Sequence, residues 1–384
     1  MTAMAASPRI GVLHVITHLS MGGAENVALQ LITGLSGEFR FALFAVQGGA
    51  PDGPVGQDML ERCDQAGCPV TWGSRHGFKT GGALQAAWRL IRVIERERPA
   101  VIHLHCEIAE LVFAVATLLR PPLRHRPVLR TVHNCTLWIG WERLGRWVSR
   151  RLSFTDAVAV SRAAAQADAA LLGPDSARPV PDVIYNSAYA PLADRRAPGG
   201  AFRVLFAGRF VHQKGADLLA PILQRAAWLC SDREVVVTLA GPGNAASRAI
   251  AAGLAGLPKN WQVRFVPPIP RLSEQIGTFD AVLMPSRFEG FSLLALETLM
   301  AGVPLVTTRA PGLDEALPAD YPLAAAVEHS GRMGEMLAAL IVQPDFYRDF
   351  VRARRPALID RFSAEKTLSA YGARYRLLAG ESIG

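Results

Sequence analysis

The chain is organised around the stretch Pro285-Ser-Arg-Phe-Glu-Gly-Phe-Ser-Leu-Leu-Ala-Leu-Glu297. The apolar run before it, residues 280–284, is typical of a buried parallel strand, and Gly302 after it is typical of the end of a helix. We therefore expect a strand, a loop with Glu289 and a helix with Glu297. The start of that helix lies between the two acids, and its unpaired N–H groups suit an anion such as a diphosphate.

Taken alone, the two acids allow two interpretations. Glu289 is either a capping acid beside a solvated Glu297, or both carboxylates accept hydrogen bonds from sugar hydroxyls on the two sides of a bound anion. The surrounding residues favour the second interpretation, because the stretch resembles the E-x7-E signature of retaining glycosyltransferases of the GT-B fold. The family is glycosyltransferase family four, also called glycosyl transferases group 1.

The resemblance is carried by a set of positions on both sides of the acids. These are Pro285, Ser286, Glu289, Gly290, Phe291, Leu293, Glu297, Met300, Ala301, Gly302 and Pro304. The chain departs from the family at Ser292, where glycine is common, and at Thr298 and Leu299, where small residues are usual.

Composition is that of a globular protein with room for two domains. The chain has 384 residues, 50% of them hydrophobic and 19% charged, which excludes a disordered chain. The longest apolar candidate, residues 108–119, is too short to cross a membrane and contains Glu110. Residues 1–9 lack the pattern of a signal peptide. We therefore expect a cytoplasmic protein.

Cysteine usage agrees with that compartment. Five cysteines lie at 63, 68, 106, 135 and 230, with neither the spacing of a zinc site nor that of a disulfide framework, which indicates a reducing environment. The net charge of +8 favours acidic partners. No nucleic-acid-binding module is visible, so we expect no nucleic acid partner.

The first half of the chain alternates between strands and helices, as a parallel α/β domain does. A strand at residues 9–16 leads through Gly22 and Gly23 into a helix that ends at Leu35. Further strands are predicted at 39–46, 70–72, 100–105, 128–133, 157–160 and 180–185, and further helices at 55–65, 83–96, 108–119 and 162–172, with one that ends at 152. The Gly-Gly pair is either a plain tight turn or, as the family's similar loop implies, a loop that closes on the donor.

A break in periodicity separates two domains. Residues 188–200 are rich in Pro, Gly and Ala and are typical of a linker. We expect a first Rossmann-like domain at 1–187, a second at 201–361, and a helical tail, about 362–384, that rejoins the first domain as the resemblance implies. The expected fold class is α/β, in the GT-B arrangement of two Rossmann-like parallel α/β domains that face each other across a cleft.

Two cations follow the first strand of the second domain. Arg209 and Lys214 lie at the carboxyl end of that strand, where open α/β sheets bind ligands, and they match the family's G-R-x4-K-G site. Arginine binds phosphate with a bidentate fork and lysine as a point charge, so the pair can clamp a diphosphate.

The resemblance implies roles for the remaining site residues. Glu297 would accept hydrogen bonds from the nucleotide ribose, Glu289 from the transferred sugar, and His133 would face that sugar unless it is a hydrogen-bonded core histidine. The other donor-binding residues would be Gly22, Gly23, Gly208, Gly241, Asn244, Ile269, Gly290, Phe291, Ser292 and Leu293. His103, His105 and Cys106 could be imagined as metal ligands, but we expect no metal, since no D-x-D motif is present and two cations serve the phosphates.

A basic, aromatic segment remains. Residues 118–151 hold eight arginines and one acid, a local charge of +7, with Trp138, Trp141 and Trp147 among them. One helical stripe would contain Leu137, Trp141, Leu144, Val148 and Leu152. Either residues 137–152 dock on an anionic membrane, such as the inner face of the cell membrane, or the stripe packs on the sheet and the arginines are solvated.

The expected function is that of a retaining, metal-independent glycosyltransferase, a hexosyltransferase that uses a UDP- or GDP-sugar and no cofactor. Its acceptor would be a glycan or a lipid-linked molecule, in bacterial polysaccharide or glycolipid biosynthesis. Arg209, Lys214 and the helix start would stabilise the departing diphosphate. The alternatives are a nucleotide-sugar epimerase or hydrolase of the same fold, or a non-catalytic subunit that binds nucleotide-sugars.

Overall fold

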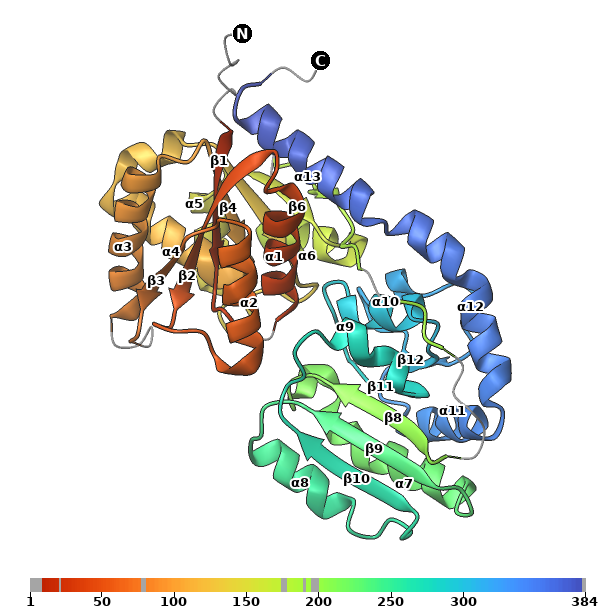
Figure 1. Ribbon diagram of the computed structural model, residues 1–384. Coiled ribbons are helices and arrows are strands. Elements are labelled where there is room, and N and C mark those ends of the chain that lie inside the picture. Colours follow the sequence, from red (N-terminus) through yellow and green to blue (C-terminus); the bar gives the residue numbers. More distant parts are fainter. Residues whose placement is uncertain are drawn as a thin grey trace. The chain divides into compact units, whose positions relative to one another are not determined.

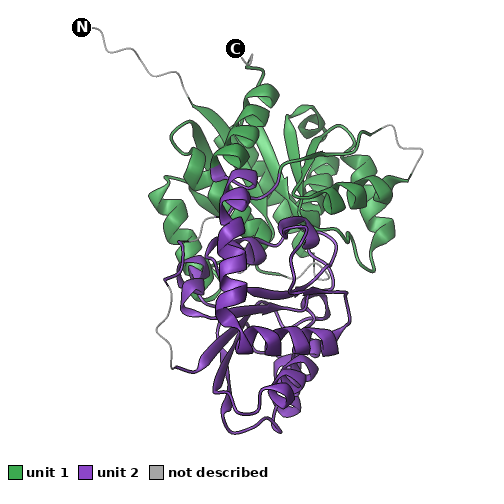
Figure 2. Cartoon of the chain, turned by 90° about the vertical axis from the view of Figure 1, so that its right-hand side faces the viewer, with its two compact units in different colours: residues 1–184, 365–384 green, residues 185–364 purple. Residues whose placement is uncertain are grey.

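A computed structural model describes residues 9–20, 22–76, 81–173, 178–188, 191–194 and 200–381 (Figure 1). The chain forms two compact units, one of residues 1–184 and 365–384 and the other of residues 185–364 (Figure 2). Residues 189–190 and 195–199 of the predicted linker, and 382–384 of the predicted tail, lie outside the described part.

The first unit is built on one seven-stranded sheet with the order β3-β2-β1-β4-β5-β6-β7, in which all pairs are parallel. Its strands are β1 (Ile10–Ile16), β2 (Phe39–Gln47), β3 (Val70–Ser74), β4 (Val101–His105), β5 (Val128–Val132), β6 (Asp156–Ala159) and β7 (Asp182–Val183). Its helices are α1 (Gly23–Leu35), α2 (Gly53–Gln65), α3 (Gly82–Glu97), α4 (Cys106–Leu119), α5 (Glu142–Arg151), α6 (Arg162–Leu172) and α13 (Ala364–Leu378).

The second unit has a six-stranded parallel sheet with the order β10-β9-β8-β11-β12-β13. Its strands are β8 (Phe202–Ala207), β9 (Val235–Ala240), β10 (Trp261–Val266), β11 (Ala281–Met284), β12 (Leu305–Thr308) and β13 (Ala324–Ala325). Its helices are α7 (Leu219–Leu229), α8 (Ala245–Gly253), α9 (Leu272–Gln275), α10 (Leu293–Met300), α11 (Ser330–Val342) and α12 (Pro344–Arg361).

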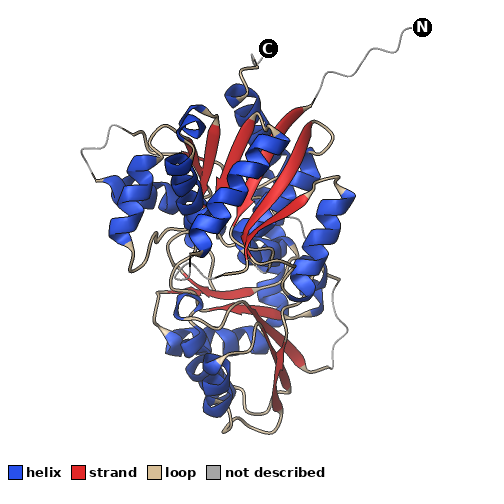
Figure 3. Ribbon diagram, turned by 90° about the vertical axis from the view of Figure 1, so that its left-hand side faces the viewer, coloured by secondary structure: helices blue, strands red, loops and turns tan. Residues whose placement is uncertain are grey.

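The central strands of both sheets are buried on both faces because helices cover both faces of a parallel sheet (Figure 3). Every residue of β4, β5, β11 and β12 is buried. The prediction of two parallel α/β units is therefore confirmed. In each sheet the strand order reverses once, between β1 and β4 and between β8 and β11, and ligands bind at such points in open α/β sheets.

Several boundaries differ from the sequence-based expectation. The helical tail predicted at about 362–384 is helix α13, and a separate helix, α12, precedes it. The two helices are separated at Phe362, whose ring is buried against Tyr185 and Phe291. The predicted strand at 180–185 is limited to β7. No helix was predicted at α8, although Asn244 and Ser247 form a capping box there, which is the local signal for its start.

The basic segment, residues 118–151, also differs from the prediction. Its helix, α5, begins only at Glu142, and the preceding residues are irregular, with Trp138 in the left-handed region. Val148 and Leu152 are fully buried in the core cluster of the first unit, and Leu144 packs against it. Four of the five stripe residues therefore pack on the domain, as the second interpretation held, whereas Trp141 is exposed.

Candidate functional site

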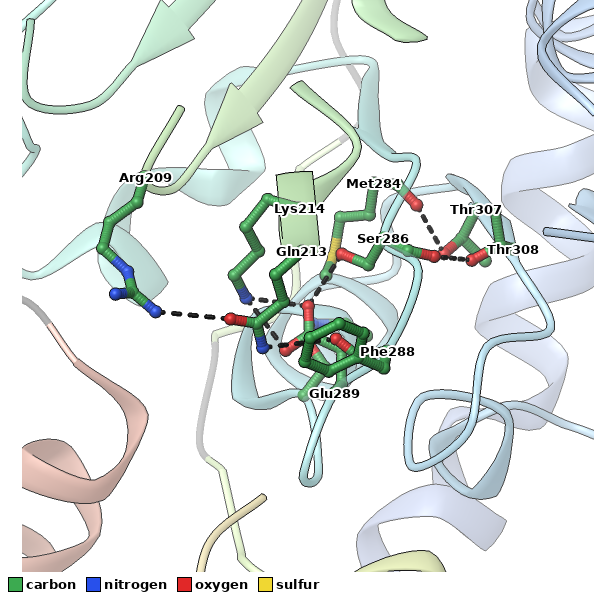
Figure 4. A network of polar contacts seen from close by, with 11 residues as sticks. Arg209, Gln213, Lys214, Met284, Ser286, Phe288, Glu289, Thr307 and Thr308 are labelled. Atoms are coloured by element: carbon green, nitrogen blue, oxygen red, sulfur yellow. Dashed lines mark hydrogen bonds and ion pairs between the residues drawn. The ribbon is translucent and has the colours of Figure 1, made fainter. Parts of the chain in front are cut away.

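Glu289 is the centre of a buried polar cluster in the second unit (Figure 4). Lys214 Nζ donates to both of its carboxylate oxygens, at 2.7 and 2.9 Å, and Ser286 Oγ donates to Oε1 at 2.7 Å. The Glu289 side chain is only 7% exposed and that of Lys214 is 23% exposed. The sequence assigned these two residues to different parts of a ligand, whereas the fold joins them as an ion pair.

Sheet topology explains why these residues meet. Lys214 follows β8 and Glu289 follows β11, and the two strands are paired neighbours at the point where the strand order reverses. The loop after β8 makes a tight turn at Gly215, with φ of 62°, and a Cβ there would lie 1.9 Å from the carbonyl oxygen of Pro285. Only glycine lets the two loops approach this closely.

A third loop supports the same acid from the other side. The backbone N–H of Glu289 donates to the Pro311 carbonyl oxygen at 3.0 Å. Gly312 has φ of 76°, and a Cβ on it would lie 2.0 Å from the Glu289 carbonyl oxygen and 2.5 Å from that of Gly290. Sequence reasoning included Gly215 in the G-R-x4-K-G match without giving it a role. It missed Gly312, although the Pro311-Gly312 dipeptide is a recognisable turn signal.

Arg209 has a different environment from Lys214. Its guanidinium is exposed and donates only to Gln213 Oε1, at 3.4 Å, among the residues that the structure describes. Gln213 in turn donates to the Phe288 carbonyl oxygen at 3.3 Å. Arg209 is therefore free to turn toward an anion, while Gln213 links its loop to that of Glu289.

The start of helix α10 offers unpaired backbone donors. Ser292 is the N-cap, and its hydroxyl oxygen accepts from the Ala295 N–H at 3.4 Å. Within the described residues, the N–H groups of Phe291, Ser292 and Leu293 have no acceptor. These groups and the positive end of the helix dipole suit an anion, and Lys214 and Arg209 supply cations in the same unit.

Glu297 lies on α10 without a partner. No hydrogen bond to its carboxyl is found in the described part of the chain, and burial raises the pKa of Glu297 to about 8. A half-buried acid in such a surrounding is costly to ionise until donors reach it. Two hydroxyls of a ligand would be suitable donors.

Each of the other predicted donor-binding residues in the second unit has a separate structural role. A Cβ on Gly241 would lie 2.2 Å from the Gly208 carbonyl oxygen, so these residues bring the loops after β8 and β9 together. Asn244 uses its side chain as the N-cap of α8 and donates to the Phe210 carbonyl oxygen at 3.1 Å. Ile269 is half-buried in the loop after β10.

The predicted site residues of the first unit lie after β1 and β5. Gly22 caps α1, and a Cβ on Gly23 would meet no described atom within 4 Å, so the backbone there is open to a ligand. His133 Nε2 is 2.9 Å from His105 Nδ1, and burial lowers the pKa of His133 to about 3, so the ring is neutral. The three histidines close enough to share an ion are His14, His103 and His105, without Cys106.

Comparison with known proteins covers both units. Residues 201–341 match the family model described as "Glycosyl transferases group 1", and residues 21–187 match "Glycosyltransferase Family 4". A D-inositol 3-phosphate glycosyltransferase of Kineococcus radiotolerans is 32% identical over 222 residues, 53% of this chain and 48% of the relative. One of Arthrobacter sp. is 35% identical over 147 residues, 35% of this chain and 33% of the relative. The chain thus spans between a third and a half of these curated relatives.

Similarity to solved structures extends further than similarity in sequence. Anabaena HepE in complex with UDP-glucose has a TM-score of 0.76 at 16% identity, over 95% of this chain and 99% of HepE. Sucrose-phosphate synthase from Thermosynechococcus elongatus has a TM-score of 0.75 at 18% identity, over 97% and 100% of the two chains. The expected GT-B fold class is therefore confirmed.

We predict that Gly312→Ala disturbs the loop that supports Glu289. The added Cβ would overlap two carbonyl oxygens, and the positive φ disfavours alanine. The free energy of unfolding of the second unit should therefore fall by roughly 1–3 kcal/mol. Urea unfolding followed by circular dichroism measures this. Gly243→Ala is the matched control, because a Cβ there meets no described atom within 4 Å. Equal stabilities of the two variants would contradict the close approach.

Proposed function

The chain belongs to the glycosyl transferases group 1, or glycosyltransferase family 4, and from this premise we propose that it transfers a sugar from a nucleotide-sugar to a glycan or lipid-linked acceptor. The observation that carries the proposal is the Lys214–Glu289 pair beside the open start of α10, at the reversal point of the sheet. The family and the relatives are named as transferases, so an epimerase, a hydrolase or a non-catalytic subunit is not favoured.

The donor site follows from the chemistry of these groups. We place the diphosphate against the free N–H groups of residues 291–293, with Arg209 and Lys214 as counter-charges. Glu297 would accept hydrogen bonds from the two ribose hydroxyls, which would stabilise its ionised carboxylate. HepE binds UDP-glucose, which supports a UDP-sugar as the first donor to test, with a GDP-sugar as the second.

The ion pair suggests how the site changes when the donor binds. Ser286 continues to hold the Glu289 carboxylate when Lys214 turns toward the phosphates, so the acid stays in place and can accept hydrogen bonds from the transferred sugar. As the bond between sugar and phosphate breaks, negative charge grows on the leaving oxygen, and the cations and the helix start stabilise it.

The remaining step is the attack of the acceptor. In the proposed retaining mechanism the acceptor hydroxyl approaches from the face that the phosphate leaves. A bond forms between its oxygen and the anomeric carbon, the bond from that carbon to phosphate breaks, and the departing diphosphate takes the hydroxyl proton. Neither a protein nucleophile nor a metal is part of this proposal. The setting would be bacterial polysaccharide or glycolipid biosynthesis.

We predict that Lys214→Ala lowers turnover by roughly 10²–10³-fold, because one preorganised group that stabilises the leaving diphosphate is lost. The assay measures release of nucleoside diphosphate from a donor and acceptor pair in excess EDTA, since the proposed mechanism needs no metal. Lys259→Ala, which removes an exposed lysine of the same unit, is the control. Turnover equal to wild type in a folded Lys214 variant would refute the role of this lysine.

We predict that uridine diphosphate releases most of one proton from the protein when it binds at pH 7. Free Glu297 is mainly protonated there because its pKa is about 8, and ribose hydroxyls favour the carboxylate, so its pKa falls on binding. Affinity should accordingly rise with pH up to about 8. Calorimetry in two buffers of different ionisation enthalpy measures the proton. Glu297→Gln should lose it and Glu274→Gln, an exposed control, should keep it; release that persists in Glu297→Gln would exclude the ribose role.

A second proposal concerns peripheral attachment to an anionic membrane. Although Val148 and Leu152 of the stripe are buried, Ile139, Trp141 and Trp147 are 63%, 59% and 39% exposed. Arg143, Arg146 and Arg150 beside them are also exposed. Arg151 is excluded from this surface, since its guanidinium donates to the Thr117 side chain and carbonyl oxygen. Among the described residues no helix is long and apolar enough to span a membrane.

We predict that changing Arg143, Arg146 and Arg150 together to Gln weakens binding to anionic vesicles by at most about 3 kcal/mol, at ~1 kcal/mol for each arginine near the surface. Binding should also fall with salt, because exposed charges are screened. Cosedimentation with anionic and neutral vesicles measures the effect. Arg233, Arg264 and Arg332 changed to Gln, with the same loss of charge in the second unit, serve as control. Equal pelleting of both triple variants would mean that this surface is merely solvated.

A further inference from the structure

A continuous row of buried polar side chains crosses the first unit. It consists of histidines from β1 and β4 and the one after β5, a threonine of β5 and two tyrosines of α13. These are His14, His103, His105, His133, Thr131, Tyr371 and Tyr375. His133, at 9% exposure, is the most accessible of them, and the others are fully buried. From the sequence, His103 and His105 were considered only together with Cys106 as metal ligands, and His133 only as a sugar contact or a core histidine.

Six contacts join these side chains end to end. Tyr371 Oη lies 3.2 Å from Thr131 Oγ1, which lies 2.7 Å from His103 Nε2. His103 Nδ1 is 2.7 Å from Tyr375 Oη, which is 3.4 Å from His14 Nε2. His14 Nδ1 is 2.9 Å from His105 Nε2, and His105 Nδ1 is 2.9 Å from His133 Nε2. His14, His103 and His105 therefore use both ring nitrogens within the row.

Every member of the row is neutral at neutral pH. Burial lowers the pKa of His14 and His133 to about 3 and lowers the pKa of His103 and His105 well below the usual range. Burial raises the pKa of both tyrosine hydroxyls, so they keep their protons. A neutral imidazole has one N–H donor and one acceptor nitrogen. A ring that accepts a hydrogen bond at one nitrogen must therefore donate from the other, so all hydrogen bonds of the row run in the same direction.

Tyr371 sets that direction because it is the fully buried end of the row. Thr131 is its only hydrogen-bond partner in the described residues, and a fully buried O–H without an acceptor is costly. Tyr371 therefore donates to Thr131. The single Thr131 proton is then donated to His103 Nε2, which leaves the His103 proton on Nδ1 for Tyr375.

The same reasoning fixes the rest of the row. The Tyr375 hydroxyl donates to His14 Nε2, His14 Nδ1 donates to His105 Nε2, and His105 Nδ1 donates to His133 Nε2. His133 thus receives a hydrogen bond on Nε2 and carries its own proton on Nδ1, for which no acceptor is found among the described residues. The opposite direction would place the His133 proton on Nε2 and leave the Tyr371 O–H unpaired.

We propose that this relay, which starts on the C-terminal helix α13, locks His133 in its Nδ1–H tautomer so that it donates a hydrogen bond to a substrate oxygen and does not act as a base. That the oxygen belongs to a sugar rests on the proposed function, whereas the tautomer does not. His14, His103, His105, Thr131 and the two tyrosines are positioning residues. They give α13 a chemical connection to the ligand end of β5.

The histidine cluster fits this relay better than it fits a metal. Ligand nitrogens of His14, His103 and His105 lie within 4.8 Å of one another, but each of these nitrogens already takes part in a hydrogen bond of the row. A metal ligand must be an unprotonated nitrogen that faces the ion, so binding would break these contacts. All three side chains are also fully buried.

The tautomer can be tested on the full chain without any ligand. In long-range ¹H–¹⁵N spectra of protein labelled with ¹⁵N-histidine, protonated and unprotonated ring nitrogens have distinct shifts. We expect His133 to be protonated on Nδ1 and unprotonated on Nε2. A His133 proton on Nε2, or zinc bound at one ion per chain with loss of the His14, His103 and His105 signals, would overturn the relay.

Tyr375→Phe removes the hydroxyl that joins His103 to His14. We expect mixed tautomers at His14, His105 and His133, while His103 keeps the donor from Thr131. Tyr321→Phe, another buried tyrosine with backbone hydrogen bonds in the second unit, should leave all four rings unchanged. If the Tyr375 variant does not fold, Thr131→Val should release the tautomers and Thr131→Ser, which keeps the hydroxyl, should retain them. Unchanged tautomers in a folded Tyr375→Phe protein would refute the relay.

A kinetic measurement separates the tautomer of His133 from its contact with the substrate. With a nucleotide-sugar donor, Tyr375→Phe should lower kcat by about 3–10-fold with little change in the donor KM, because the His133 N–H is correctly placed in only part of the molecules. An unchanged kcat together with mixed tautomers would remove His133 from the substrate contact. If wild type transfers no sugar, the proposed function fails, and the ligand-free spectra still decide the tautomer.

Discussion

All strands within each sheet run parallel, and the rest of the structure depends on this constraint. Parallel strands need cover on both faces, which buries the central strands throughout, and they bring all carboxyl ends to one edge. The loops after β1, β8 and β11, at the reversal points, carry several of the candidate site residues, and His133 follows the neighbouring strand β5. Glycines at 215 and 312 then allow these loops to pack against one another at backbone distance.

In the second unit that edge carries charged side chains and free N–H groups that suit an anion. A lone buried carboxylate or ammonium group would be unfavourable, but Lys214 and Glu289 neutralise each other and Ser286 fixes the acid. Glu297 is not neutralised by a partner and is instead kept largely protonated by its burial. Arg209 remains exposed. The proposed ligand, with a diphosphate and neighbouring hydroxyls, would satisfy all four side chains at once.

The first unit contains polar groups that are buried more deeply than the site itself. Arg130 is fully buried on β5 and is paired with Glu110 at 3.0 Å and Asp168 at 3.5 Å, and the histidine row runs through β1, β4 and β5 to the tyrosines of α13. Both networks use the interior of the sheet, where hydrogen bonds are strong and unpaired groups are costly. The last helix of the chain is therefore part of the interior of the first unit and is joined to it by specific contacts.

The sequence by itself determined the α/β class, most strands and helices, and the positions of Arg209, Lys214, Glu289 and Glu297 around the strand ends. These features are local, since each depends on apolar periodicity or on the spacing of a few neighbouring residues. Only the tertiary structure decided that Lys214 pairs with Glu289, that Val148 and Leu152 are core residues, and that Tyr375 joins His14 to His103. Such contacts join residues far apart in the chain, and they depend on which strands become neighbours in the sheet, which no local pattern encodes.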